Sequence, residues 1–433
     1  MRRKLFRLGI LGRNIPALAL GATLFLAGCG ALDDLLSVDA PSRVVASDLD
    51  DPNAANLLVS SVGNEFRCTF THYAAASALT GNEMGEATNT TVLTIWDTRI
   101  HDTSGYGSQY ASTDCGSGQP ALYLPLSRTR WLGAQVLESL NEWTDEAVSN
   151  RSQKIAEVSL YTAYTYLLFA EAFCDNEMAF DGGPRQSREA TWSTAVTLFD
   201  QAIVSGTADV VNAARVGKGR ALLNLGQYGD AASAVGSVPE GFSWELPYSN
   251  AEAVTRNKLW ELNARDEEIT VEPIYRDVMF DGVPDPRISV TDVGTTGAGS
   301  TIPIFTADKY PSADSPQEVA SWEEAQLIIA EANARAGNPA ELAAAVDIIN
   351  VLHDNAGLPD FSSTDQADIL AQIEYERMAE FFLEGQHLHD LWRFDQDLVP
   401  ATGEDHPFGA FYGDEICFDL PAVEFLNNPN AAG

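Results

Sequence analysis

The sequence lacks the motifs that identify the common enzyme classes. It contains no G-x-S-x-G nucleophile turn, no H-E-x-x-H or C-x-x-C metal motif, no Walker loop and no G-x-G-x-x-G dinucleotide motif. The glycine-rich stretch GTTGAGS, residues 294–300, is not followed by a segment with helical periodicity, which a phosphate-binding loop requires. These absences favour a binding protein over an enzyme, and we expect neither a cofactor nor a metal.

Basic residues are scarce as well, with 26 Lys and Arg against 62 Asp and Glu and a formal net charge of −36 at pH 7. An acidic surface repels the phosphates of nucleic acids, so DNA and RNA are excluded as partners. Long apolar runs are also missing. After residue 28 no stretch offers the roughly 18 consecutive apolar residues of a membrane-spanning helix, and we expect none there.

The first 28 residues have the pattern of a lipoprotein signal peptide. Five basic residues lie within positions 2–13, and the apolar stretch 15–28 is too short for a permanent membrane helix. It ends in Leu26-Ala27-Gly28-Cys29, which resembles a bacterial lipobox and implies that Cys29 is lipidated and becomes the new N-terminus. Acyl chains anchor a protein with about 0.8 kcal/mol per buried CH₂. We expect residues 29–433 to form one domain tethered to a membrane, although a secretory peptide with a chance cysteine is an alternative.

Four further cysteines are present, at Cys68, Cys115, Cys174 and Cys417. An even number in an exported protein predicts two disulfides, for which three connectivities exist. We favour Cys68–Cys115 and Cys174–Cys417, the first closing an N-terminal loop and the second tying a helix end to the C-terminal tail. Buried free thiols are the alternative.

The middle of the chain predicts helical hairpins. Apolar residues recur every third or fourth position across 131–174, and residues 213–239 resemble the tetratricopeptide pattern of small residues on two facing helices. A second Ala-rich pair spans 322–352. Because such hairpins bury their apolar faces only by stacking, we predict a mostly α fold: tetratricopeptide-like hairpins within about 131–393 in a right-handed superhelical scaffold. Loop-rich insertions such as 281–314 and a few short strands complete it.

The segment 375–394 mixes charged and apolar residues at helical spacing, and we expect one helix there. The acids at 376, 380 and 384 form an i, i+4, i+8 column. Arg377 lies three residues before Glu380 and His387 three residues after Glu384, where they compensate the like charges. Acid–base catalysis needs carboxylates that converge from different elements, which a column on one helix does not provide. We interpret the set as a network of ion pairs that holds neighbouring helices in register. Its members are Glu376, Arg377, Glu380, Glu384, Asp390 and Arg393.

The C-terminal motifs ERMAEFFLEGQHLHDLWR, residues 376–393, and PAVEFLNNPN, residues 421–430, follow the lipobox and the hairpins. This succession resembles the SusD/RagB family of outer-membrane nutrient-binding lipoproteins. The resemblance implies a SusD-like fold, no catalysis, and binding of a nutrient, usually a glycan oligomer and in some members a peptide. It also implies a cell-surface position as the lid of a SusC-like TonB-dependent outer-membrane barrel. A lipid-anchored tetratricopeptide scaffold that assembles envelope proteins is the alternative function.

The loop-rich region 82–124 contains the aromatic residues that we select as ligand-binding candidates, because aromatic faces stack on the CH surfaces of sugars. They are Trp96, Tyr106 and Tyr110. Trp96 could equally be a core residue, whereas we expect Tyr106 and Tyr110 to be exposed.

Overall fold

The computed structural model describes residues 50–431, and of Tyr106 only the backbone. The predicted signal peptide 1–28, the predicted lipidation site Cys29 and the residues up to 49 lie outside the described part. Within it, no helix combines the length and the apolar composition needed to cross a membrane.

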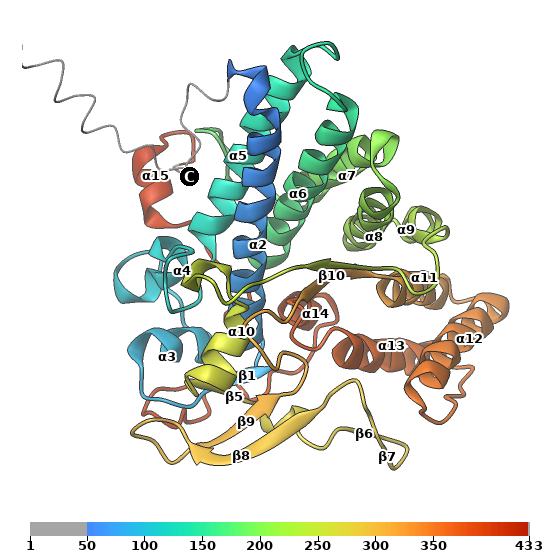
Figure 1. The fold of residues 1–433 in the computed structure, drawn as a ribbon. Helices are drawn as coiled ribbons and strands as arrows, with labels where there is room; N and C mark the ends of the chain where they lie inside the picture. The colour runs from blue at the N-terminus through green and yellow to red at the C-terminus, as the bar shows by residue number, and fades with distance from the viewer. Residues whose placement is uncertain (1–49, 432–433) are drawn as a thin grey trace, which may run out of the picture. The chain divides into compact units, whose positions relative to one another are not determined.

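Three long helices form the first part of the fold. Helix α2 (Ala55–Thr80) packs against α5 (Tyr123–Glu142) and α6 (Arg151–Ala172), as Figure 1 shows. A short 3-10 turn, η2 (Pro52–Ala54), precedes α2, with Asp51 accepting a hydrogen bond from the backbone N–H of Asn53. Nearly every residue in the second half of α2 is buried. An amphipathic pattern is therefore absent there, because the helix is surrounded by other elements.

Helical hairpins follow, as the small-residue patterns predicted. They are built from α7 (Arg188–Ser205), α8 (Ala208–Asn224), α9 (Tyr228–Val235), α11 (Trp322–Ala336), α12 (Pro339–Ala356) and α13 (Gln366–Glu380). Two glycines of α8 permit close approach: a Cβ on Gly217 would lie 2.3 Å from the ring of Phe199, and one on Gly219 would lie 2.4 Å from Val235. The turn between α11 and α12 uses Gly337, whose φ of +75° suits glycine.

Short elements connect the hairpins. The short helices are α3 (Thr91–Asp97), α4 (Gln109–Ser112), α10 (Lys258–Trp260), α14 (His387–Arg393) and α15 (Ala422–Asn427). The turns of other helical types are η3 (Gly105–Ser108), η4 (Ala253–Thr255), the π-helix η5 (Glu261–Arg265) and η6 (Pro273–Tyr275).

All strands of the described residues lie in two-stranded antiparallel pairs. The pairs are β1 (Met84–Glu86) with β5 (Ile269–Val271), β2 (Met178–Ala179) with β3 (Arg185–Gln186), β4 (Ser243–Leu246) with β10 (Gln317–Ser321), β6 (Met279–Phe280) with β7 (Val283–Pro284), and β8 (Val290–Thr296) with β9 (Pro303–Ala307). The open excursion expected at 281–314 is thus largely the β8–β9 hairpin, whose β8 strand is mostly exposed. The architecture is mostly helical with few strands, as predicted.

The structure contains the disulfides Cys68–Cys115 and Cys174–Cys417, which are the two pairings that the sequence favoured. The second disulfide lies beside a parallel β-bridge between Phe173 and Phe418. It therefore fixes the C-terminal tail to the end of α6.

Candidate ligand-binding pocket

Two of the aromatic residues predicted to contact a ligand are instead part of the core. Trp96 is 0% exposed and Tyr110 is 1% exposed, and both pack against Phe418 of the C-terminal tail. The Tyr110 hydroxyl donates a hydrogen bond to the backbone carbonyl of Asp419 at 2.9 Å. The expected exposure of Tyr110 is therefore wrong, because the tail covers this loop. The side chain of Tyr106 lies outside the described part.

The sequence predicted one helix across 375–394, and this prediction is wrong. Helix α13 ends at Glu380, and α14 begins only at His387. Leu383 and Gly385 between them have φ of +63° and +81°, so the chain turns here. A Cβ on Gly385 would lie 3.0 Å from the ring of Tyr73, which explains why glycine occupies this position. The acids at 376, 380 and 384 consequently do not form a column.

Buried ion pairs join three helices at this break. Arg377 of α13 donates to both carboxylate oxygens of Asp390 in α14, at 2.8 and 3.0 Å. Arg393 of α14 donates to both oxygens of Glu331 in α11, at 2.7 and 2.9 Å, and lies 3.2 Å from Asp390. Arg377 therefore pairs with Asp390 rather than with the nearby Glu380. This network holds neighbouring helices together, which agrees with the structural interpretation of these motif residues.

Glu376 belongs to a second buried set. Its carboxylate accepts hydrogen bonds from His353, Gln372 and Arg287 at 2.7, 2.6 and 2.7 Å, and the residue is 0% exposed. Arg287 also forms a bidentate pair with Asp285. Every acceptor here faces a protein donor, so Glu376 has a structural role.

Glu380 and Glu384 differ from the other motif residues, because they border an open pocket of about 550 Å³. We call it the acidic pocket. It lies between the end of α13, β4, β10 and the loop after β9, and its charged lining consists of Glu245, Asp314, Glu318, Glu380, Glu384, Arg287 and Lys309. Five acids against two bases make the pocket acidic, so it favours neutral or cationic ligands over anionic ones.

Burial shifts the ionisation of the two motif acids in this pocket. It raises the pKa of Glu380 to about 7 and that of Glu384 to about 8, and neighbouring carboxylates add to the effect. Lys309 lies 2.6 Å from Glu384 and opposes the shift. Near neutral pH these carboxyls are therefore partly protonated. In that form they can both donate and accept hydrogen bonds, as the hydroxyl groups of a sugar require.

This shift predicts that stability falls as pH rises. An unfolded Glu carboxyl ionises near pH 4.5, whereas folded Glu384 ionises near pH 8. The folded state therefore holds an extra proton between these values, and the free energy of unfolding decreases through that window. The free energy of unfolding at pH 5 should exceed that at pH 8, and Glu384→Gln should reduce this difference by on the order of 3 kcal/mol. Urea denaturation at the two pH values measures it. The control is Glu245→Gln, which changes an exposed acid of the same pocket. An equal effect of both substitutions would contradict the prediction.

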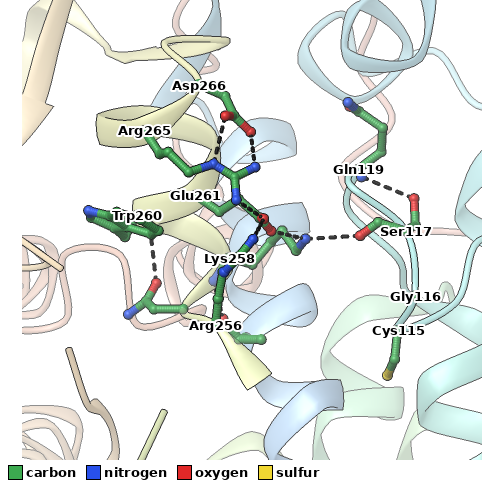
Figure 2. Close-up of polar contacts among 12 residues, drawn as sticks. Cys115, Gly116, Ser117, Gln119, Arg256, Lys258, Trp260, Glu261, Arg265 and Asp266 are labelled. Carbon is green, nitrogen blue, oxygen red and sulfur yellow. Dashed lines mark hydrogen bonds and ion pairs between the residues drawn. The ribbon is translucent and has the colours of Figure 1, made fainter. Parts of the chain in front are cut away.

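A second charged cluster surrounds Glu261 in the π-helix η5 (Figure 2). Arg256, Lys258 and Arg265 all pair with its carboxylate. The ammonium group of Lys258, a residue only 2% exposed, also donates to the backbone carbonyl of Ser117 at 2.9 Å. The cluster thereby ties the loop containing Ser117 to the helix. Its contacts are within the protein, so we assign it a structural role.

Glu86, Asp97 and His406 bring three potential metal-ligand atoms within 4.8 Å of one another. Nδ1 of His406 accepts a hydrogen bond from the backbone N–H of Phe408 at 3.3 Å, which leaves the proton on Nε2. Nε2 then donates to Asp97 at 3.0 Å, and Glu86 accepts from Thr94 at 2.6 Å. The nitrogen lone pair that a metal would need is absent in this tautomer. The residues fit a hydrogen-bonded cluster better than a metal site.

Comparisons with known proteins agree with the C-terminal motifs. Residues 324–419 match the model of the SusD family. Among solved structures, a SusD superfamily protein from Bacteroides vulgatus is similar to this chain, with a TM-score of 0.68 and 16% identity over 88% of this chain and 98% of that one. A SusD-like carbohydrate-binding protein from Bacteroides vulgatus has a TM-score of 0.66 and 15% identity, over 88% and 97% of the two chains. A SusD superfamily protein from Parabacteroides distasonis has a TM-score of 0.66 and 14% identity, over 90% and 99%.

No protein with a curated description matches the sequence significantly. The family match and the shared fold nevertheless confirm two predictions, the SusD/RagB resemblance and the SusD-like fold.

Proposed function

Because residues 324–419 match the model of the SusD family and the chain shares the fold of SusD-like structures, we propose that it is a SusD-family surface lipoprotein that binds a nutrient without chemical conversion. In this role it is the lid of a SusC-like TonB-dependent transporter in the outer membrane, anchored through a lipid on Cys29. We favour a glycan oligomer as its ligand, and a peptide is the alternative.

The observation that carries this proposal is the position of the family match. Residues 324–419 include α13, α14 and all but the first two residues of α11. These are the helices that the buried ion pairs of Glu331, Arg377, Asp390 and Arg393 join. The same segment supplies Glu380 and Glu384 to the acidic pocket. The family-specific residues thus build a rigid frame next to an open pocket, as binding of a ligand requires.

The same geometry disfavours a glycoside hydrolase. Glu384 is held by Lys309, and Glu380 lies 3.4 Å from Arg287, so each acid of the pair already has a cationic partner. A hydrolase needs one acid and one base that are free to act on opposite sides of a bond. Release of reducing ends from an oligosaccharide by the purified protein would contradict the proposal.

The partner is tested by gentle detergent extraction of membranes from the native host, followed by identification of copurifying proteins. We expect a large β-barrel with a plug domain. Cys29→Ser should move the protein from the membrane fraction to the soluble fraction, because it removes the thiol that carries the lipid. The matched control is Ser37→Ala, a substitution in the same N-terminal stretch that leaves the thiol intact. Copurification of a soluble envelope protein without a barrel would support the alternative scaffold function.

A further inference from the structure

A second hollow of about 580 Å³ lies far from the C-terminal motifs in sequence. It is formed by the N-terminal ends of α2 and α6, the turn before α8, and β4. We call it the aromatic groove. The residues that line it include Tyr161, Trp244, Asn56, Asn150, Gln153 and Glu157. Its volume falls within the range of about 300–1,000 Å³ that is typical of small-molecule sites.

From these residues we propose that the aromatic groove is a saccharide-binding site for neutral glycan oligomers. The inference deepens the proposed function and rests on it, because it adds a second surface for the same class of ligand, in addition to the acidic pocket.

Two aromatic side chains line the aromatic groove, and buried aromatic rings of the core contact them. Trp244 and Tyr161 are half-buried, with ring centroids 6.0 Å apart. Trp244 also stacks on the fully buried Phe66, at 6.2 Å and an interplanar angle of 15°, and lies 5.4 Å from Tyr164. Because the core fixes these rings, they can stack on a sugar with little loss of side-chain entropy.

Glycine at position 63 lets helix α2 approach Tyr161 closely. A Cβ there would lie 3.2 Å from the ring of Tyr161, closer than ordinary van der Waals contact. Helix α2 therefore approaches Tyr161 without pushing its ring out of the groove.

Amide side chains surround the floor. Asn56, Asn150 and Gln153 make no side-chain hydrogen bond to any other described residue of the chain, although each carries two donors and one acceptor oxygen. Such groups match the donors and acceptors of neighbouring sugar hydroxyls.

The charges of the groove balance. Glu157 and Lys154 both line it, and the Lys154 charge opposes the rise that burial causes in the pKa of Glu157. A groove with one acid and one base has no strong preference for charged ligands, in contrast to the acidic pocket. The acidic pocket also offers no exposed ring, since its tyrosine, Tyr310, is 3% exposed. Stacking on a sugar is therefore better served by the aromatic groove.

The test uses the mature chain and isothermal titration calorimetry with neutral gluco-, xylo- and manno-oligosaccharides. We expect at least one of these probes to bind, and Trp244→Ala to weaken that binding by about tenfold or more. Because Trp244 also contacts the core, a second variant, Asn56→Ala with Gln153→Ala, changes only exposed amides. It should weaken binding about threefold to tenfold without lowering the melting temperature. Gln227→Ala, an exposed amide outside the groove, is the matched control and should have no effect.

The possible results test the saccharide-binding site and the receptor role separately. If both groove variants bind the oligosaccharide as the unmodified protein does, the groove is not the saccharide-binding site, and the proposed function still stands. Binding of peptides in the groove, competed by no oligosaccharide, would overturn the assignment of a saccharide. Absence of binding to all the neutral probes would also overturn the assignment, whereas the receptor role is judged separately by copurification of the barrel.

Discussion

Glu331→Gln is expected to lower the free energy of unfolding by about 3–5 kcal/mol, measured by urea denaturation at pH 7. Glu331 is 0% exposed and accepts hydrogen bonds from both Arg393 and Arg335. Burial would raise the pKa of this carboxyl, but the neighbouring arginines outweigh burial and lower it, so the group is a carboxylate. Its neutralisation leaves the buried guanidinium of Arg393 with Asp390 as its remaining carboxylate, and Arg377 already pairs with Asp390.

The matched control is Asp200→Asn, which removes the acid of the exposed pair Lys218–Asp200. Water solvates both partners of that pair, so the expected loss is below about 1 kcal/mol. If the two substitutions cost the same, the buried network is not what joins α11 to α14.

Replacing Cys174 and Cys417 by serine is expected to cost about 2–5 kcal/mol and to expose the C-terminal tail to proteases. This disulfide closes a loop with a sequence separation of 243 residues, and loop closure restricts the unfolded chain more as the loop grows. Chemical denaturation gives the loss of stability, and limited proteolysis with mass spectrometry identifies the released segment.

The comparison is the double replacement of Cys68 and Cys115, whose sequence separation is 47. In the chain-entropy model it should cost about 1–2 kcal/mol less than loss of the longer loop. It should also leave the tail protected. Cleavage of the tail in both double variants, or in neither, would show that Cys174–Cys417 does not control its attachment.

The hairpins could be predicted from the sequence because their packing leaves a local signature. Positions such as Gly217 and Gly219 must be small where helices touch, and the turn at Gly337 needs a left-handed residue. Both requirements restrict residue types close to where they act, so periodicity and small residues identify them.

The break in the motif segment could not be predicted in the same way. Apolar residues keep helical spacing across it, because Phe381, Phe382, Leu388 and Leu391 are all buried although the chain turns between them. Leucine at 383 in a left-handed conformation is rare, so only Gly385 gave a local signal.

The acidic pocket and the burial of Trp96 depend on long-range contacts. Lys309 contacts Glu384, which is 75 residues away in the sequence, and Trp96 contacts Phe418, which is more than 300 residues away. The sequence predicted a loop-rich region at 82–124 with Tyr106 and Tyr110 exposed. It could not reveal that the tail returns to cover this loop.

That returning tail has a consequence for biogenesis. Phe418 packs on Trp96, and the backbone N–H of Ala422 donates to the carbonyl of Thr103. The region around Trp96 and Thr103 thus lacks a portion of its packing until residues 418–422 have been synthesised. A nascent chain that has not yet reached these residues therefore remains incompletely folded over this region.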